Sequence, residues 1–422
     1  MTTASIDDNK ASREIKTSFW DVLAKKTILK VLHKIEVGRL VLEDEGQVYE
    51  FGEPADTATV TAHIFVHHIS AYKDVLFGGT IGSGEAYMLG SWSSSSLLNV
   101  IRLMVLNIET LNKMDNSRPV IGRITSKLMH FLNANTQSGS RKNISAHYDL
   151  GNDFFRLFLD PTMMYSSAVF PSEKASLEEA SINKLDLICK KLNLTETDHL
   201  MEIGTGWGGL AIHAAKNYGC KVTTTTISRE QYEYACEAVK REGLEDKITL
   251  LLEDYRNLTG CYDKLVSVEM IEAVGHKYYD SYFAKCSSLL KDDGLMLIQA
   301  ITIADQRYEE AKRSVDFIQR YIFPGGCLPS NEVIAKCIAR KTDLMIVGLH
   351  DIGQDYAKTL AEWRRRFHAN MDAVKQQGFD DIFCRMWEFY LCYCEGGFLE
   401  RVISTAQIVF AKPGARAIQP AV

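Results

Sequence analysis

The stretch that decides the fold is Leu200-Met201-Glu202-Ile203-Gly204-Thr205-Gly206-Trp207-Gly208-Gly209. An apolar run that ends in a carboxylate passes into a glycine turn, and the good helix formers of residues 210–215 follow. This order predicts a strand, a tight loop and a helix. Gly204, Gly206 and Gly208 lack a Cβ atom, so the loop can turn sharply and its backbone can approach a ligand. We therefore expect a nucleoside-cofactor pocket at the carboxyl end of a parallel sheet, although such turns also occur as plain structure.

The sequence after this loop alternates between strand and helix patterns. The expected strands are residues 221–227, 248–252, 262–268 and 294–301. Helices are expected near 229–242, 278–290 and 308–321, and the tail 355–406 is expected to lie over the ligand end of the sheet or beside it. Strands separated by helices indicate a mostly parallel sheet covered on both faces. The predicted fold class is therefore α/β.

The residues before the glycine loop divide into a smaller N-terminal domain and a linker. Short strands with polar turns are expected at 38–43, 47–51 and 62–67, after an early helix near 28–32. The polar stretch 133–143 is predicted as the linker, which gives domains 1–132 and 144–422. The apolar helix 97–108, which the preceding serines can cap, is predicted to lie in the core or between the domains, or alternatively to meet lipid.

The composition limits the classes of function. The chain has 422 residues, a net charge of −6 and 46% hydrophobic residues. No broad basic surface favours a nucleic-acid partner, no apolar stretch approaches the roughly 20 residues of a spanning helix, and the acidic start lacks the features of a secretory signal. The ten cysteines show neither a Cys-x-x-Cys pair nor a zinc spacing. We therefore expect reduced, mostly buried thiols, no metal site and a cytoplasmic protein.

The glycine loop resembles the first motif of Rossmann-like S-adenosylmethionine-dependent methyltransferases. Four further stretches narrow this resemblance, and they are 147–155 (HYDLGNDFF), 164–170 (MYSSAVF), 269–276 (EMIEAVGH) and 321–329 (YIFPGGCLP). In this order they closely resemble the cyclopropane-fatty-acyl-phospholipid synthase family, which includes the mycolic acid cyclopropane synthases. The resemblance runs from about residue 144 to the C-terminus, and residues 84–92 resemble the N-terminal domain of that family.

The resemblance implies a Rossmann-like class I methyltransferase core with a mostly parallel seven-stranded sheet. It also implies a smaller N-terminal domain that docks lipid or holds a dimer. The methyl donor would be S-adenosylmethionine. The residues that would bind this cofactor are Tyr165, Ser166, Glu202, Gly204, Gly206, Gly208, Thr226, Gln231, Asp254 and Tyr255.

The resemblance implies that the base which accepts the proton is a bound bicarbonate ion rather than a side chain. A buried anion of this kind needs hydrogen-bond donors around it. Carried over residue by residue, the catalytic residues would be Glu272, Tyr356, Gln299, Ser167, and Ile301 through its backbone. A carboxyl group beside an anion implies a raised pKa for Glu272. Well-known bacterial members have Cys where this chain has Ser167 and His where it has Gln299. These two departures leave the fate of a carbocation in the site open.

The resemblance implies transfer of a methylene unit from S-adenosylmethionine to the cis double bond of an unsaturated phospholipid acyl chain, which gives a cyclopropane. Two alternatives stay open. One is a C-methyltransferase with a methyl- or methylene-branched product and a separate reductase as partner. The other is a non-catalytic lipid-binding relative. We expect a protein bound peripherally to the inner face of the membrane, in contact with the phospholipid bilayer and unsaturated acyl chains, and a homodimer is one option.

Overall fold

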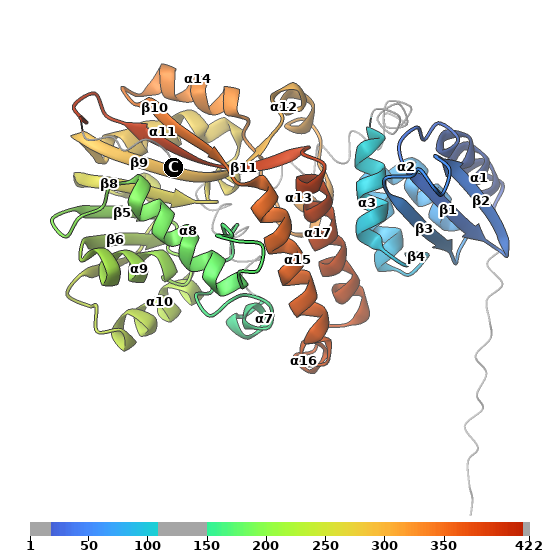
Figure 1. Ribbon diagram of the computed structural model, residues 1–422, viewed down its shortest axis with the longest axis horizontal. Coiled ribbons are helices and arrows are strands. Elements are labelled where there is room, and N and C mark those ends of the chain that lie inside the picture. Colours follow the sequence, from blue (N-terminus) through green and yellow to red (C-terminus); the bar gives the residue numbers. More distant parts are fainter. Residues whose placement is uncertain (1–17, 109–149, 417–422) are drawn as a thin grey trace, which may run out of the picture.

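Two separate β-sheets organise the molecule (Figure 1). The computed structural model describes residues 18–108 and 150–416, which we call the N-terminal lobe and the large lobe. The expected linker, 133–143, lies outside the described residues, so the division into domains stays a prediction. Among the described residues, no helix is long and apolar enough to cross a membrane.

The N-terminal lobe packs helices against a sheet of strand order β2-β1-β3-β4. Its elements are α1 (Phe19–Leu32), β1 (Arg39–Asp44), β2 (Gln47–Gly52), β3 (Thr61–Val66), α2 (Ser70–Met88), β4 (Trp92–Ser94) and α3 (Leu97–Leu106). The strands expected from the sequence are present, and β4 is an additional short edge strand. Ser96 caps α3, because its Oγ accepts a hydrogen bond from the backbone N–H of Asn99.

The large lobe is built on a sheet of strand order β10-β11-β9-β8-β5-β6-β7. Its strands are β5 (His199–Ile203), β6 (Lys221–Thr226), β7 (Ile248–Leu252), β8 (Tyr262–Val268), β9 (Leu290–Ile303), β10 (Met345–Asp351) and β11 (Ile403–Ala411). Strands β5 to β9 pair in parallel, and β11 runs antiparallel to both of its neighbours. The α/β class and the mostly parallel seven-stranded sheet of a Rossmann-like core are confirmed.

The helices of the large lobe are α7 (Asn152–Arg156), α8 (Leu177–Lys191), α9 (Gly209–Tyr218), α10 (Arg229–Arg241), α11 (Tyr279–Ser288), α12 (Asp305–Ala311), α13 (Phe317–Tyr321), α14 (Asn331–Lys341), α15 (Gly353–Ala369), α16 (Met371–Gln376) and α17 (Asp381–Leu399), with 3-10 turns η1 (Tyr255–Asn257), η2 (Ile271–Ala273) and η3 (His276–Tyr278). Of these, α8, α9 and α10 pack on one face of the sheet, and α11 and α14 pack on the other. Side chains alternate along the strands. In β9, Leu295 and Leu297 pack with α8 and α9, whereas Met296 and Ile298 pack with α11 and α14.

Some elements differ from the sequence-based expectation. Residue patterns did not single out β10 and β11 as strands. Apolar side chains of β10, such as Met345 and Leu349, are exposed, so its pattern is not that of a buried strand. The helix expected over 308–321 is two helices, α12 and α13, because Asp316 caps a new helix through the backbone N–H of Gln319.

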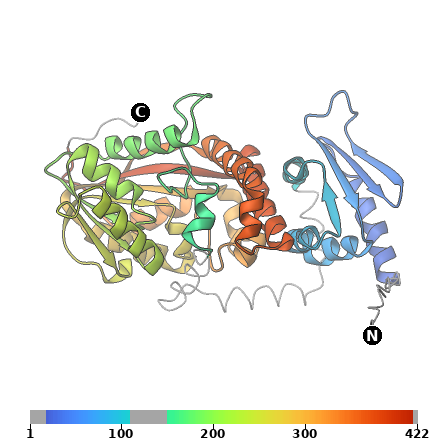
Figure 2. The same cartoon turned by 90° about the horizontal axis from the view of Figure 1, so that it is seen from below.

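The two lobes share one hydrophobic core. Helices α2 and α3 face α13 and α17 across the interface (Figure 2). The rings of Phe317 and Phe389 lie 4.5 Å apart there, against Gly84 of α2. Arg102 pairs with Glu400 at 2.5 Å, and this ion pair joins α3 to the end of α17. The apolar helix 97–108 therefore lies between the lobes, as one of its two predicted placements required.

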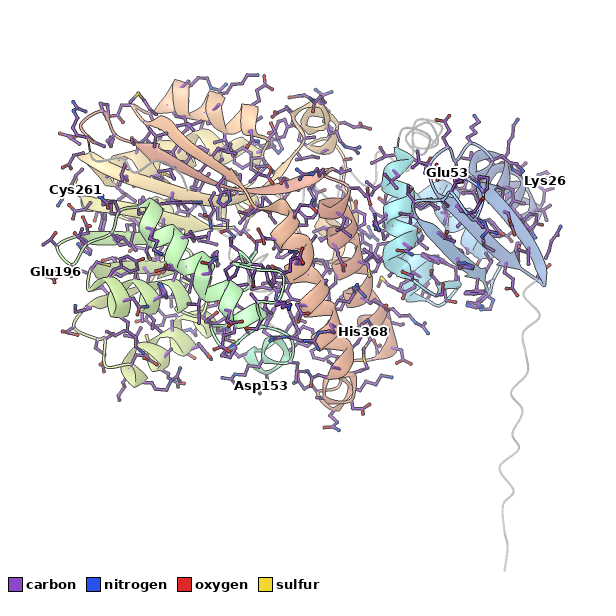
Figure 3. The ribbon with its side chains drawn as sticks, in the orientation of Figure 1. Lys26, Glu53, Asp153, Glu196, Cys261 and His368 are labelled. Atoms are coloured by element: carbon purple, nitrogen blue, oxygen red, sulfur yellow. The ribbon has the colours of Figure 1, made fainter. Side chains whose placement is uncertain are left out.

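The cysteines agree with the expectation of reduced thiols. All ten are free, and seven of them are buried. Cys261 is exposed, at the end of the large lobe remote from the N-terminal lobe (Figure 3). Burial raises the pKa of Cys286 to about 12, so this thiol stays protonated at neutral pH.

Candidate active site

A cavity of about 640 Å³ lies at the carboxyl ends of β5, β6 and β8. Its walls come from the loops after these strands, from helices of the large lobe and from α2 and α3 of the N-terminal lobe. The predicted cofactor-binding residues that line it are Tyr165, Ser166, Glu202, Gly204, Gly206, Thr226, Gln231, Asp254 and Tyr255. Three of the predicted catalytic residues, Glu272, Ile301 and Tyr356, line the same cavity. Gly208, Ser167 and Gln299 do not line the cavity themselves.

The glycine loop has the backbone that the sequence predicts. Gly204, Gly206 and Gly208 have φ angles of 106°, 52° and 90°, which L side chains rarely adopt. A Cβ atom on Gly206 would meet no atom within 4 Å, so the loop leaves open space on the cavity side. A Cβ on Gly208 would lie 3.3 Å from the Cβ of Ala235, and this glycine forms the turn into α9.

Glu202 lies next to the last residue of β5 and lines the cavity. Its Oε2 accepts a hydrogen bond of 2.6 Å from Thr224 Oγ1, which in turn lies 2.7 Å from Thr205 Oγ1. Burial raises the pKa of Glu202 to about 8. The carboxyl group therefore holds a proton near neutral pH and can both donate and accept hydrogen bonds.

The loops after β6 and β7 form the next part of the wall. Thr226 Oγ1 donates a hydrogen bond of 2.8 Å to Gln231 Oε1. The carboxylate of Asp254 accepts from Nε and Nη2 of Arg256 at 2.8 and 2.7 Å. The ring of Tyr255 adds an aromatic surface beside this ion pair. A base or ribose is the kind of ligand part that such a wall suits.

Tyr165 and Ser166 form another part of the cavity wall. The Tyr165 ring lies 5.1 Å from that of Trp363, and its Oη lies 2.8 Å from the Oη of Tyr390. Ser166 Oγ accepts a hydrogen bond of 2.9 Å from Lys184 Nζ. Lys184 is fully buried, and burial lowers its pKa to about 8. The site therefore contains a buried amine whose charge interacts with the carboxyl groups of Glu269 and Glu202.

Glu269 directly follows β8, and its carboxylate accepts hydrogen bonds from three of the predicted catalytic residues. Its Oε1 accepts hydrogen bonds from the backbone N–H of Ser167 at 2.9 Å and from Gln299 Nε2 at 2.8 Å. Its Oε2 accepts from Tyr356 Oη at 2.8 Å. Burial raises the pKa of Glu269, while these hydrogen bonds and the nearby charge of Lys184 oppose the rise.

Glu272 lies one turn further along the chain. Its Oε1 accepts a hydrogen bond of 2.5 Å from the backbone N–H of Ile301, and its Oε2 has no hydrogen-bond partner among the described residues. Burial, and then the charge of Glu269, raise the pKa of Glu272 to about 8. The raised pKa expected for Glu272 is present, and the neighbouring anion is a protein carboxylate.

The far part of the cavity is largely apolar. The N-terminal lobe contributes Val75, Leu76, Ile101, Met104, Val105 and Ile108, and the large lobe contributes Ile318, Phe323, Phe389, Tyr390 and Ile403. Arg307 of α12 also lines the cavity, and its buried Nε has no hydrogen-bond partner in the described part of the chain. A ligand with a long hydrocarbon part and a polar end suits these walls.

The predicted donors do not fit a separate bicarbonate ion. Those of Ser167, Gln299 and Tyr356 are used by one carboxylate, and the N–H of Ile301 is used by the other. The hydroxyl of Ser167 donates to the carbonyl of Ala168 at 2.9 Å. The glycine loop, in contrast, leaves space for S-adenosylmethionine, because no side chain fills it.

Sequence reasoning missed two parts of this site. Glu269 belongs to a stretch that carried the family resemblance, but it had no role assigned. Its place directly after a buried strand, three residues before Glu272, was the available signal. The sequence near Leu76 and Met104 did not predict a cavity wall, because apolar residues in a helix are equally typical of a hydrophobic core.

Comparisons with known proteins identify the family of this chain. The family model for mycolic acid cyclopropane synthetase matches residues 135–408. Tuberculostearic acid methyltransferase UfaA1 of Mycobacterium tuberculosis is 37% identical over 376 residues, which are 87% of this chain and 87% of that protein. The cyclopropane-fatty-acyl-phospholipid synthase of Escherichia coli strain K12 is 38% identical over 361 residues, 85% of this chain and 90% of that protein.

Solved structures give the same result. Mycolic acid cyclopropane synthase CmaA1 complexed with SAH and CTAB has a TM-score of 0.60 and 31% identity, and the match covers 64% of this chain and 98% of that chain. Coclaurine N-methyltransferase bound to N-methylheliamine and SAH has a TM-score of 0.58 at 20% identity, and the match covers 78% of this chain and 98% of that chain. The second likeness concerns the fold alone.

Proposed function

This chain belongs to the mycolic acid cyclopropane synthetase family and is an S-adenosylmethionine-dependent methyltransferase, and from this premise we propose its acceptor and product. The acceptor is the cis double bond of an unsaturated phospholipid acyl chain, and the product is a cyclopropane fatty acid. Acceptor and product need a proposal of their own because relatives carry different names, among them sphingolipid C9-methyltransferase.

One observation carries the proposal. A single cavity joins the glycine loop, the two carboxyl groups of Glu269 and Glu272, and a long apolar wall from both lobes. A water-soluble acceptor has no need of such a wall, whereas an acyl chain gains free energy by burying its methylene groups there.

The residues of the site suit a reaction through a carbocation. When bound, S-adenosylmethionine supplies an electrophilic methyl group. An isolated alkene is a weak nucleophile, so the protein must hold it in line with that methyl group and exclude water. The apolar side chains of α3 and α13 exclude water, and the rings of Phe389 and Tyr390 offer π-faces to a positive charge.

A second candidate keeps the same acceptor and changes the product. Loss of a proton from a rearranged cation would give a methylene-branched chain, and a separate reductase would then complete a methyl branch. Two observations favour this candidate: Gln299 stands where well-known members have His, and a relative that covers most of this chain is named a methyltransferase of tuberculostearic acid.

The decisive experiment identifies the product. Purified protein is incubated with S-adenosylmethionine and vesicles of a phospholipid with cis-unsaturated chains, and vesicles of a saturated phospholipid serve as the control. We expect a mass gain of one methylene unit in the unsaturated chains and upfield cyclopropane ring protons by NMR. Alkene signals of an exomethylene would select the second candidate. Lipid binding without consumption of S-adenosylmethionine would contradict both.

We also propose peripheral binding to the cytoplasmic, inner face of the membrane through α1, on the outer side of the N-terminal lobe (Figure 1). Phe19, Trp20 and Leu23 are exposed in its first turns, at 75%, 57% and 42%. The exposed Lys26 and Lys30 continue the face of Phe19 and Leu23 at helical spacing. Aromatic side chains beside lysines suit an anionic interface.

Vesicle sedimentation tests this membrane contact. Trp20→Glu should reduce binding to anionic vesicles, while Ile182→Glu, at an exposed apolar position of α8, should leave it unchanged. Equal binding of the two variants would contradict the assignment. A homodimer held by the N-terminal lobe stays a prediction, and the mass of the protein in solution tests it.

The family resemblance predicts a bicarbonate ion in this site. Because the hydrogen-bond donors predicted for that ion bind the carboxylates of Glu269 and Glu272 instead, no step of the proposed reaction is assigned to it.

A further inference from the structure

Donors from three distant parts of the chain converge on one carboxylate, that of Glu269. They are the N–H of Ser167, the side-chain amide of Gln299 and the hydroxyl of Tyr356. The family resemblance assigns the same three residues to a bound bicarbonate. We propose that the Glu269 carboxylate takes the place of that external anion and accepts the proton that the reaction releases. This inference rests on the proposed methyl transfer to an alkene.

The position of the carboxylate suits this role. Glu269 lines the cavity together with Glu272 and the glycine loop, whereas Ser167 and Gln299 lie behind it. Tyr356 Oη is the hydrogen-bond donor to Oε2 among the described residues, so a lone pair of that oxygen remains available. The carboxylate is therefore both held and accessible from the cavity.

The backbone of Glu269 is unusual for a residue with a side chain. Its φ of 49° lies in the left-handed region that favours glycine. Its N–H donates to the carbonyl of Gln299 at 2.7 Å, so both backbone and side chain are bound to the same residue. Strained backbone positions cluster at functional sites. A glycine at 269 would keep this backbone and leave the three donors facing a space the size of a small oxyanion.

A buried chain of hydrogen bonds fixes the direction of the Gln299 amide. Lys191 Nζ donates to Gln407 Oε1 at 2.6 Å, and Gln407 Nε2 donates to Gln299 Oε1 at 3.0 Å. Because an ammonium group can only donate, each amide in the chain has one allowed orientation. The NH2 group of Gln299 is thereby directed toward Glu269, which an acceptor in that place requires.

The surrounding charges leave the negative charge on Glu269. Two carboxyl groups in a dry site do not both ionise readily, and burial, followed by the charge of Glu269, raises the pKa of Glu272 to about 8. Glu269 has three hydrogen-bond donors, and the buried Lys184 favours its ionised form. Glu272 therefore carries the shared proton, and Glu269 carries the charge.

The chemical step balances with this assignment. The alkene uses its π electron pair to bond the methyl carbon of the sulfonium, and the sulfur keeps the pair of the broken C–S bond. The neighbouring alkene carbon becomes cationic. Glu269 Oε2 takes a proton from the transferred methyl group, and the released C–H pair closes the cyclopropane ring. The proton leaves the carboxyl group to solvent before the next turnover.

The test compares Glu269→Gly with Glu269→Gln in buffers freed of carbon dioxide. Methyl transfer to unsaturated phospholipid vesicles is measured with and without millimolar bicarbonate. The wild-type rate should not depend on bicarbonate. Glu269→Gly should lose activity by about 100-fold or more, and bicarbonate should raise it again by about tenfold or more, because the ion can enter the emptied place. Glu269→Gln should be inactive with and without bicarbonate, because its amide fills that place.

A binding measurement makes the result independent of turnover. Isotope-labelled bicarbonate, observed by NMR, should bind Glu269→Gly and not the wild type. Binding of S-adenosylmethionine should be equal in all three proteins, and Glu245→Gly, at an exposed turn position, serves as the matched control.

Each alternative outcome has one meaning. A wild type that needs or binds bicarbonate overturns the inference, and so does a Glu269→Gly variant that is active without it. A wild type without lipid product overturns the proposed function instead. The binding measurement then still decides whether Glu269 occupies the place of the anion.

Discussion

Glu269 and Glu272 lie three residues apart after β8, yet their surroundings differ. Three donors bind the first carboxylate, and one backbone N–H binds the second. Near neutral pH the pair therefore holds one negative charge and one proton. This division can be measured as a dependence of stability on pH.

Glu272→Gln should make the free energy of unfolding less dependent on pH. Folding raises the pKa of Glu272 from 4.5 to about 8, so between these values the folded protein holds a proton that the unfolded chain releases. The stability of the wild type therefore falls as pH rises through this window, by up to about 1.4 kcal/mol per pH unit, and it becomes independent of this group above the folded pKa. The glutamine variant lacks this contribution.

Urea titrations at about pH 6 and about pH 7.5 test this expectation. The variant should gain up to about 2 kcal/mol relative to the wild type between the two conditions. Glu245→Gln, at an exposed position, should show no such gain. A pH-independent difference between Glu272→Gln and the wild type would contradict the raised pKa.

Gly206→Val should abolish binding of S-adenosylmethionine. The φ of 52° strains a β-branched residue, and the new side chain would enter the space at the cavity wall. Gly243→Val is a matched control, because Gly243 has a φ of 65° and open space around it but lies outside the cavity. Calorimetry should show at least about a 100-fold loss of affinity for Gly206→Val and none for the control. Equal affinities would show that the loop is not the pocket.

At the scale of elements, α3 explains why an internal helix can be apolar almost all round. Leu103 faces the core of the N-terminal lobe, while Ile101, Met104 and Val105 line the cavity. The spacing of these three residues places them on one helix face. The helix therefore joins the hydrophobic core on one side and forms a wall for an acyl chain on the other.

Met104→Trp should shorten the acyl chains that the protein accepts. A larger side chain on α3 fills the part of the cavity remote from the glycine loop, so long chains lose more binding free energy than short ones. In vesicles that mix unsaturated phospholipids of two chain lengths, the product ratio should shift about fivefold or more toward the shorter chain. Met104→Leu should leave the ratio near that of the wild type, and a ratio unchanged in both variants would contradict the wall assignment.

At the scale of the whole molecule, the cavity exists because two lobes close on each other. Residues of α2 and α3 complete the cavity walls that α13 and α17 begin. Gly84 allows the close approach, because a Cβ atom there would lie 2.5 Å from the Phe317 ring. Tyr87 Oη also donates to Glu388 at 2.8 Å, which adds a polar contact between the lobes.

Gly84→Ala should therefore disturb the fit of the lobes, whereas Gly78→Ala in the same helix adds a methyl group in open space. Overpacking of this kind costs about 1–3 kcal/mol, so the melting temperature of Gly84→Ala should fall by several degrees. Its transfer to vesicle lipids should drop, while its binding of S-adenosylmethionine should persist. Equal melting temperatures for the two variants would show that the interface is not tightly packed.

Features that depend on neighbours along the chain could be predicted from the residue pattern alone. Short runs rich in β-branched and apolar residues predicted strands such as β6 and β8, and the turn chemistry of Gly204 and Gly206 predicted the loop. Both depend on backbone geometry over a few residues, so local pattern suffices. The sequence motifs indicated the family, and the residues on the cofactor side of the cavity were predicted from that resemblance.

The side chains that meet across the site could not be predicted in this way, because their contacts form only in the folded protein. Ser167, Gln299 and Tyr356 come from distant segments, and their donors converge on Glu269 because the folded sheet and α15 bring them together. Met104 likewise became a cavity wall through the docking of the lobes. Hydrogen-bond direction and wall position depend on the relative placement of elements, which local residue patterns do not specify.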